Sequence, residues 1–320
     1  MSDELAYDLS PFIRVYKDGQ VDRLVENIVP PSFDLKTGVQ SIDLIISSET
    51  GLSARLYIPK TAINTTQKLP LLVYFHGGGF CIETAFSTTF HNYLNSLVSL
   101  AKIMAVSVEH RRAPEHPIPA AYDDSWEALK WVDSHVEGKG SSEWLNSHAD
   151  FDRVFFAGDS AGANISNNLA IRLGLSEETL RIKLRGIVLV HPYFCGKEPV
   201  GEEANKLEIK AYADGFWSLA SPSSVGGSDD PLINPEKDPN LGRLGCGKVL
   251  ICVAEKDFFK DRGLYYYELL KKTGWGGDVE IMEAKGEDHV FHLINSDCDE
   301  AVTMLNKIVS FINSSECFFH

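Results

Sequence analysis

The sequence is short of basic residues and has no long apolar run. Its 320 residues include 30 lysines and arginines against 45 aspartates and glutamates, a formal net charge of −15. This charge disfavours nucleic acid and anionic membrane surfaces as the main partners, because both would repel the protein. No stretch approaches the roughly 18 consecutive apolar residues that a membrane-spanning helix needs. We therefore expect a protein that binds neither nucleic acid nor a membrane.

The sequence also lacks the usual marks of secretion and of metal binding. Residues 1–8 have neither the basic nor the apolar region of a secretory signal, so we expect a cytoplasmic protein. No two cysteines form a C-x-x-C pair, which favours reduced thiols over a disulfide framework or a zinc site. The six scattered cysteines are Cys81, Cys195, Cys246, Cys252, Cys298 and Cys317.

What the chain does have is an alternation of strand-like and helix-like segments. Apolar residues recur at every second position on both sides of a turn within residues 39–59, which predicts a hairpin. Apolar runs of strand length predict buried strands at 69–75, 103–108, 154–157, 186–191, 249–254 and 279–283. Helical patterns lie between them, at 90–100, 120–136, from about 163, at 261–272 and at 299–312. This alternation predicts an α/β fold with a mostly parallel sheet.

Two segments interrupt the alternation. Residues 1–40 show no sustained periodicity, and we expect an irregular arm with a short helix or two. Residues 194–247 are rich in glycine, proline, serine and acidic residues, with a helical pattern only at 207–219. Because long insertions in compact domains are often functional, we predict that this segment is a lid, the alternative being a surface excursion without substrate contact. The core is then expected in two parts, 41–193 and 248–320.

A G-x-S-x-G motif lies where a predicted strand turns into a predicted helix. In such an elbow the serine occupies a strained turn with little space around it, so the flanking positions must be small. Here Gly158 and Gly162 flank Ser160. Although similar runs of small residues occur in ordinary loops, the strand before the motif and the helix after it make Ser160 the candidate nucleophile.

A serine hydroxyl needs a base to take its proton, and the base needs an acid to orient it. In hydrolases with this elbow, the chain order is serine, acid, histidine, with the histidine beyond the last strand. Asp257 follows the strand predicted at 249–254, and His289 follows the one at 279–283. We predict these two as acid and base.

Three other carboxylates compete with Asp257 for the role of the acid. They are Glu255, Asp261 and Asp288. Asp288 adjoins the histidine, and successive side chains in an extended loop diverge. Asp261 is expected to begin a helix, where a carboxylate has an independent reason to be. Asp257 is therefore preferred.

A glycine triplet follows the strand predicted at 69–75. The sequence His76-Gly-Gly-Gly-Phe80 supplies backbone that can turn N–H groups toward a substrate oxygen, as an HGGG oxyanion motif does. The N–H of Ala161, directly after the serine, is the expected partner donor. A glycine triplet alone is more often a loop, but together with the serine elbow it indicates an oxyanion hole.

Together these motifs resemble the plant carboxylesterases of the hormone-sensitive lipase family. The resemblance rests on HGGGF, RRAPEHPIPAAYDD, GDSAGAN, AEKD and GEDHVFHL, and it extends to DLSPFIRVYKDG near the start and to DPLINP. It implies an α/β-hydrolase fold with no cofactor and a cap built from residues 1–40 and 194–247. It also implies a triad of Ser160, Asp257 and His289. The implied oxyanion hole consists of Gly78, Gly79 and Ala161.

The same plant group contains proteins that are not esterases. The gibberellin receptors replace the triad histidine, whereas His289 is present here, which argues against a pure receptor. Many 2-hydroxyisoflavanone dehydratases carry threonine at the nucleophile, so Ser160 favours hydrolysis without excluding elimination. The similar alkaloid cyclases have an altered HGGG motif and changes at the positions of Asp257 and His289.

The sequence therefore predicts a serine carboxylesterase acting on small or medium esters. A cofactor-free lyase, dehydratase or cyclase and a hormone receptor are the alternatives. The natural ester and the oligomeric state are left open. His110 stands where tyrosine or phenylalanine is more usual, and the sequence offers no function for it.

Overall fold

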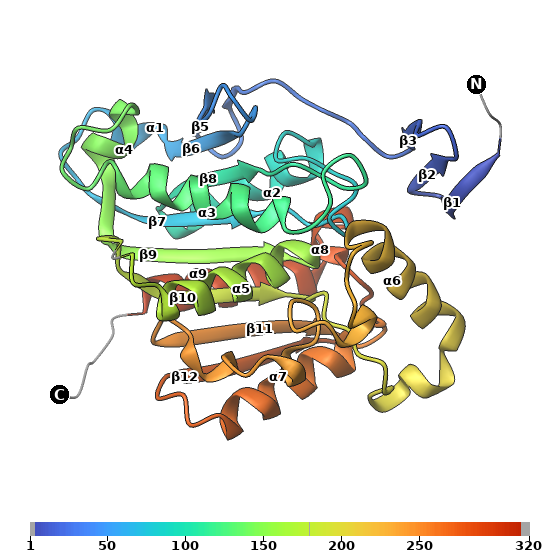
Figure 1. The fold of residues 1–320 in the computed structure, drawn as a ribbon. Coiled ribbons are helices and arrows are strands. Elements are labelled where there is room, and N and C mark those ends of the chain that lie inside the picture. The colour runs from blue at the N-terminus through green and yellow to red at the C-terminus, as the bar shows by residue number, and fades with distance from the viewer. Residues whose placement is uncertain (1–3, 179, 315–320) are drawn as a thin grey trace.

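A computed structural model describes residues 4–178 and 180–314, and one large sheet runs through it (Figure 1). Its strands, from edge to edge, are β12 (Asp278–Ala284), β11 (Lys248–Ala254), β10 (Leu184–Val190), β9 (Ala149–Asp159), β7 (Leu69–Phe75), β8 (Met104–Glu109), β6 (Ser53–Pro59), β5 (Val39–Ile45) and β4 (Phe33–Asp34). The strands from β12 to β8 pair in parallel, and β6, β5 and β4 are antiparallel. The predicted α/β fold with a mostly parallel sheet is confirmed.

Helices cover both faces of the sheet, as the wholly buried strand β7 requires. One face carries α3 (Ala120–Asp133), α5 (Ala161–Leu175) and α7 (Lys260–Lys272). The other carries α2 (Thr88–Ala101) and α9 (Asp299–Asn313). The predicted helices are confirmed to within a few residues. Three short helices escaped prediction: α1 (Lys60–Ile63), α4 (Glu143–His148) and α8 (Phe291–Ile294).

The amino-terminal arm differs from expectation. Its residues 5–23 form a small antiparallel sheet of β1 (Leu5–Leu9), β2 (Ile13–Tyr16) and β3 (Val21–Arg23). The expectation of a short helix or two is wrong for the described part of this arm. Ile13 and Val15 alternate with more exposed neighbours, and Gly19 makes the turn between β2 and β3 with φ of +87°. This period of two and the Asp-Gly turn favour a hairpin over a helix.

The inserted segment contains one long helix and several short ones. The helix expected at 207–219 is α6 (Leu207–Ala220). The 3₁₀ helices are η1 (Gly201–Asn205), η2 (Gly227–Asp229), η3 (Pro235–Lys237) and η4 (Leu241–Arg243). We call β1–β3 together with residues 195–247 the cap. The strands β1–β3 and helix α6 lie beyond the ends toward which the parallel strands point (Figure 1). Gly247, at the end of the inserted segment, has returned to the start of β10, where its amide donates a hydrogen bond to the Arg185 carbonyl.

The two parts of the cap contact each other directly. The Tyr212 hydroxyl on α6 donates a hydrogen bond to the carbonyl oxygen of Leu9 at 2.9 Å. The rings of Phe216 and Phe12 lie 6.4 Å apart. Segments about 200 residues apart in the sequence therefore form one layer at this end of the sheet.

The expectations about the cysteines and about membrane-spanning segments can also be compared with the structure. Five cysteines are free thiols, namely Cys81, Cys195, Cys246, Cys252 and Cys298, and Cys317 lies outside the described residues. Among residues 4–178 and 180–314, none of the helices has the length and apolar character that crossing a bilayer requires.

Candidate active site

Ser160 stands on a sharp turn between β9 and α5. Its φ of 52° and ψ of −116° are rare for a residue with a side chain, a conformation that costs about 1–3 kcal/mol. Backbone hydrogen bonds hold it there, because its N–H donates to the Val190 carbonyl at 2.9 Å and its carbonyl accepts from the Tyr193 N–H at 3.0 Å. The serine is buried, with 7% of its surface exposed.

The glycines beside Ser160 have no room for a side chain. A Cβ at Gly162 would lie 1.9 Å from the carbonyl oxygen of Phe75, and one at Gly158 would lie 2.5 Å from the same atom. Phe75 is the last residue of β7, so the elbow presses against the end of the neighbouring strand. Both positions therefore require glycine for packing, as the elbow interpretation predicts.

His289 and Asp257 meet at the same end of the sheet. The distance from His289 Nδ1 to Asp257 Oδ2 is 2.9 Å, and the carboxylate side chain is fully buried. Burial acts to lower the pKa of His289, but the negative charge of Asp257 and their hydrogen bond outweigh it, so this pKa is raised. Burial acts to raise the pKa of Asp257, and the charge of His289 and the same bond outweigh it, so that pKa is lowered. The pair therefore favours an ionised carboxylate beside a histidine that readily accepts a proton.

The competing carboxylates are engaged elsewhere. Glu255 accepts a backbone hydrogen bond at 2.8 Å in the loop that carries His289. Asp261 accepts one at 2.7 Å from the cap. Asp288 accepts one at 2.7 Å from the amide of His289, not from its ring. Asp257 is thus the carboxylate that bonds to the imidazole.

Of the two hydrogen bonds of a triad, the one between serine and histidine is not formed among the described residues. Within the described chain, no hydrogen bond joins Ser160 to His289. The residue before the serine, Asp159, is nevertheless electrostatically coupled to His289, and burial raises its pKa to about 6. The structure thus places the predicted acid and base together and the serine on its elbow. The serine–histidine contact stays a prediction.

The glycine loop presents unused amide donors. Gly78 and Gly79 have φ of +100° and +59°, in the region that favours glycine. Their N–H groups and that of Ala161 meet no acceptor among the described residues. A Cβ on Gly77 would lie 2.3 Å from an Asp159 carboxylate oxygen, so the loop packs tightly against the serine elbow. These free donors are what an oxyanion hole needs, and their alignment with a substrate stays a prediction.

The structure gives His110 a packing role. Its ring stacks on that of His76, the first residue of the glycine loop, with centroids 4.2 Å apart and planes 7° from parallel. Both side chains are buried, and burial lowers the pKa of each, which keeps both rings neutral. A flat neutral ring at position 110 therefore supports the loop in the way that an aromatic residue would.

One site residue was missed from the sequence. His191 follows β10 and is completely buried, and its Nδ1 accepts a hydrogen bond at 3.0 Å from the amide of Val290, next to His289. One ligand atom each of His191, Asp257 and His289 lie within 4.8 Å of one another, a donor set that a divalent cation could use. The sequence held one signal for His191, which is the last residue of the strand predicted at 186–191.

Comparisons with known proteins agree with this fold. The sequence model of a family described as having the α/β-hydrolase fold matches residues 72–293. A protein named probable carboxylesterase 13 from Arabidopsis thaliana is 49% identical and covers 99% of this chain and 100% of its own. A 2-hydroxyisoflavanone dehydratase from Glycyrrhiza echinata is 44% identical over 97% of each chain. A solved hyperthermophilic esterase from the archaeon Pyrobaculum calidifontis is 26% identical, with a TM-score of 0.70 over 86% of this chain and 84% of its own.

Proposed function

This chain belongs to the α/β-hydrolase family, and from that premise we propose that it is a serine carboxylesterase acting on small to medium carboxylic esters. The observation that carries the proposal is the hydrogen bond between the half-buried His289 and the buried Asp257, at the edge where Ser160 stands on its elbow. A histidine with a raised pKa beside a carboxylate is suited to take a proton from a hydroxyl. Relatives named carboxylesterase support the same reaction.

The reaction proceeds in two halves. The Ser160 hydroxyl oxygen attacks the ester carbonyl while His289 takes its proton, and Asp257 holds the imidazole and stabilises its charged form. The tetrahedral intermediate collapses, the bond to the alcohol breaks, and His289 gives its proton to the departing oxygen. Water then attacks the acyl-serine in the same way, which releases the carboxylic acid and restores the serine.

Charge that develops on the carbonyl oxygen meets the free amides of Gly78, Gly79 and Ala161. Such prepositioned donors typically contribute about 3 kcal/mol each to the transition state. They need no reorganisation during the reaction, since the loop is already packed against the elbow.

The cap supplies the walls around the ester. A Cβ at Gly79 would lie 2.6 Å from the ring of Phe216, so helix α6 reaches down to the glycine loop. Outside the cap, at the start of α7, the ring of Phe259 lies 5.2 Å from that of His289. Aromatic rings beside the glycine loop and beside His289 favour esters with apolar groups.

The decisive experiment combines ester hydrolysis with active-site labelling. Short-chain p-nitrophenyl esters are expected to turn over, and a serine-directed organophosphate is expected to stop turnover with a single adduct on Ser160 by mass spectrometry. Ser160→Ala should lower kcat by more than about 10³-fold. Ser96→Ala, which removes a serine on α2 bonded only to the carbonyl of Asn92, is the matched control and should not change the rate. A Ser160→Ala protein with near wild-type hydrolysis would contradict the proposal.

A second candidate is elimination of water from a β-hydroxy carbonyl compound. It is favoured by the 44% identity to a 2-hydroxyisoflavanone dehydratase and by the absence of a hydrogen bond between Ser160 and His289 in the described chain. His289 would remove the proton next to the carbonyl, and the oxyanion loop would stabilise the enolate. The carbon–oxygen bond would then break while the protonated His289 returns its proton to the hydroxyl, which leaves as water. Product analysis with a 2-hydroxyisoflavanone separates the candidates, because an unsaturated product without any ester cleavage identifies the lyase.

A further inference from the structure

His191 lies where the backbones of all three predicted catalytic elements converge. It directly follows β10, and that strand lies between β9, which leads to Ser160, and β11, which leads to Asp257. The residue before it, Val190, accepts the hydrogen bond from the Ser160 amide, and Tyr193 donates to the Ser160 carbonyl. The segment 190–193 therefore holds the serine elbow from both sides.

The side chain of His191 reaches the third element. Its Nδ1 accepts the hydrogen bond at 3.0 Å from the amide of Val290, the residue that follows His289. Both bonded residues are in the left-handed region, with φ of 47° at His191 and 50° at Val290. Non-glycine residues avoid this region unless their surroundings hold them there. The hydrogen bond is one of the contacts that hold the loop carrying His289 in this conformation.

The hydrogen bond from the Val290 amide fixes the tautomer of the His191 ring. Because Nδ1 accepts an N–H, it carries no proton, and the proton of the neutral imidazole is on Nε2. Burial lowers the pKa of His191 strongly, although the nearby charge of Asp257 acts in the opposite direction. The other titratable groups around the ring are His289 and His292, and burial lowers the pKa of His292 to about 3. Because the His191 ring is neutral, the negative charge of Asp257 is paired with His289.

We propose that His191 is a positioning residue, which holds the loop of His289 in place against Asp257 by accepting the amide hydrogen bond of Val290. This inference rests on the proposed function, since it assigns a part of the same site. His191 does not touch the substrate. Its effect is to keep the imidazole of His289 bonded to the carboxylate while the serine elbow is held from the same segment.

Two amide substitutions separate this role from simple packing. His191→Asn places an oxygen near the position of Nδ1, where it can still accept from Val290, whereas His191→Gln places its oxygen near the position of Nε2. His191→Gln is expected to lower kcat by about 10- to 100-fold, the effect of misplacing a catalytic group by about an ångström. His191→Asn should stay within a few fold of the wild type. His292→Gln is the matched control, since that buried histidine has no hydrogen bond on either ring nitrogen.

The pH profile gives a second readout. A loosened bond to Asp257 lowers the pKa of His289, so the acid limb of kcat/KM should move to lower pH in His191→Gln and stay in place in His191→Asn and His292→Gln. Equal losses in the Asn and Gln variants, or an unmoved limb in His191→Gln, would overturn the proposal. Titration of the His289 ring by NMR in the free proteins tests the same shift without turnover. A protein without esterase activity would thus refute the proposed function and leave this inference testable.

Discussion

The carboxyl edge of the sheet and the cap beside it are held by different kinds of contact. At the edge, backbone meets backbone, and even one added carbon at Gly162 would collide with the end of β7. Between the arm and α6, the contacts are side-chain hydrogen bonds such as that of the Tyr212 hydroxyl, and aromatic rings. The close backbone approaches at Gly158 and Gly162 leave no room for any side chain, whereas a side-chain contact can be replaced by another of similar size. We therefore expect substitutions at the edge to have larger effects than substitutions in the cap.

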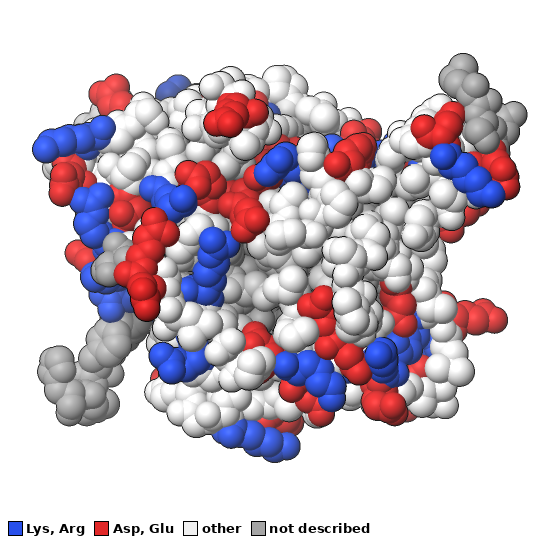
Figure 2. Space-filling view, in the orientation of Figure 1, with Lys and Arg blue, Asp and Glu red and all other residues white. Residues whose placement is uncertain are grey.

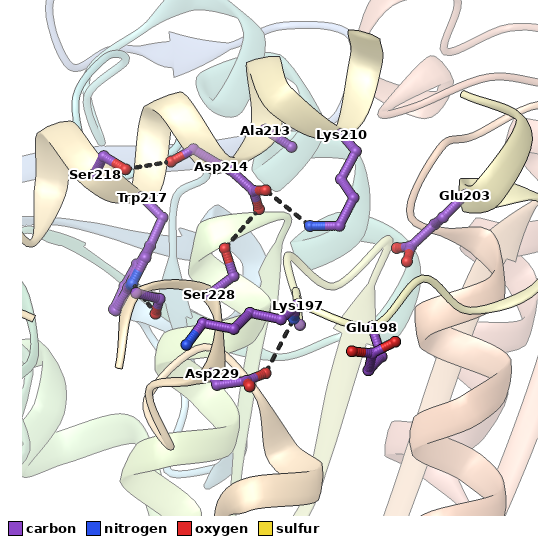
Figure 3. A network of polar contacts seen from close by, with 12 residues as sticks. Lys197, Glu198, Glu203, Lys210, Ala213, Asp214, Trp217, Ser218, Ser228 and Asp229 are labelled. Atoms are coloured by element: carbon purple, nitrogen blue, oxygen red, sulfur yellow. Dashed lines mark hydrogen bonds and ion pairs between the residues drawn. The ribbon is translucent and has the colours of Figure 1, made fainter. Parts of the chain in front are cut away.

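The interior of the cap follows the same pattern (Figure 3). Asp214 on α6 accepts hydrogen bonds from Lys210 at 2.7 Å and from the Ser228 hydroxyl at 2.8 Å. Lys197 donates its amide to Asp229 at 3.0 Å. Figure 3 shows these groups between α6 and the segments below it. Each of these bonds contributes on the order of 1 kcal/mol.

The molecular surface differs less sharply between the two regions. In the face shown in Figure 2, acidic and basic side chains are interspersed over the core and the cap. Neither region presents a continuous basic face in this view. On this face, surface charge does not distinguish the core from the cap.

The largest effect is expected from a change at the edge that preserves shape. Asp257→Asn should lower kcat about 10⁴-fold, because a neutral amide holds the histidine in the wrong tautomer. A base with a raised pKa is lost as the pH falls through that pKa, so wild-type activity should decline on the acid side, and the remaining activity of the variant should extend to lower pH. Steady-state kinetics between about pH 5 and 9 measure both effects.

The competing acid provides the control for this substitution. Asp261 bonds to the backbone of the cap, so Asp261→Asn should change kcat by no more than about threefold. If Asp261→Asn instead caused the larger loss, the assignment of the acid would be wrong.

The next largest effect is expected from a substitution at the edge that adds a side-chain carbon. Gly162→Ala brings a carbon to 1.9 Å from a backbone oxygen that cannot move without displacing β7. The free energy of unfolding should fall by about 3 kcal/mol or more, at the upper end of overpacking effects. Urea unfolding measures it. Gly276→Ala is the matched control, since nothing lies within 4 Å of its added carbon, and a comparable loss there would remove the distinction between the two sites.

The difference between the tightly packed sheet edge and the cap also explains which parts of the fold could be predicted from the sequence. Buried strands such as β7 carry continuous apolar runs, and the elbow needs glycines at fixed positions, so both leave strong local patterns. The start of β9 was missed because only Ala149 and Asp150 of residues 149–153 pair with β7, and three of these five residues are charged. The strands of the arm are three to five residues long and mostly half exposed, which is too little for a clear period. Their turn at Gly19 was the one usable signal.

The site was predictable where a role is tied to a motif, and not where it depends on neighbours in space. Ser160, Asp257 and His289 stand at positions that strand ends and chain order indicate. His191 has no motif, because its contact with Val290 joins residues 99 positions apart. His110 was likewise unexplained until its ring was found on that of His76. Contacts of this kind arise only when strands from different parts of the chain are placed side by side.

The smallest effect is expected within the cap. Tyr212→Phe removes the hydroxyl that bonds to Leu9 and leaves the ring in place, so the free energy of unfolding should fall by only about 1 kcal/mol. Because this bond ties α6 to the arm, the arm should become more sensitive to protease, and KM should rise a few fold while kcat stays unchanged. Tyr265→Phe removes an exposed hydrogen bond on α7 and is the control. A Tyr212→Phe protein with lowered kcat and unchanged KM would show that the cap takes part in the chemistry. The proposed difference between the sheet edge and the cap would then be wrong.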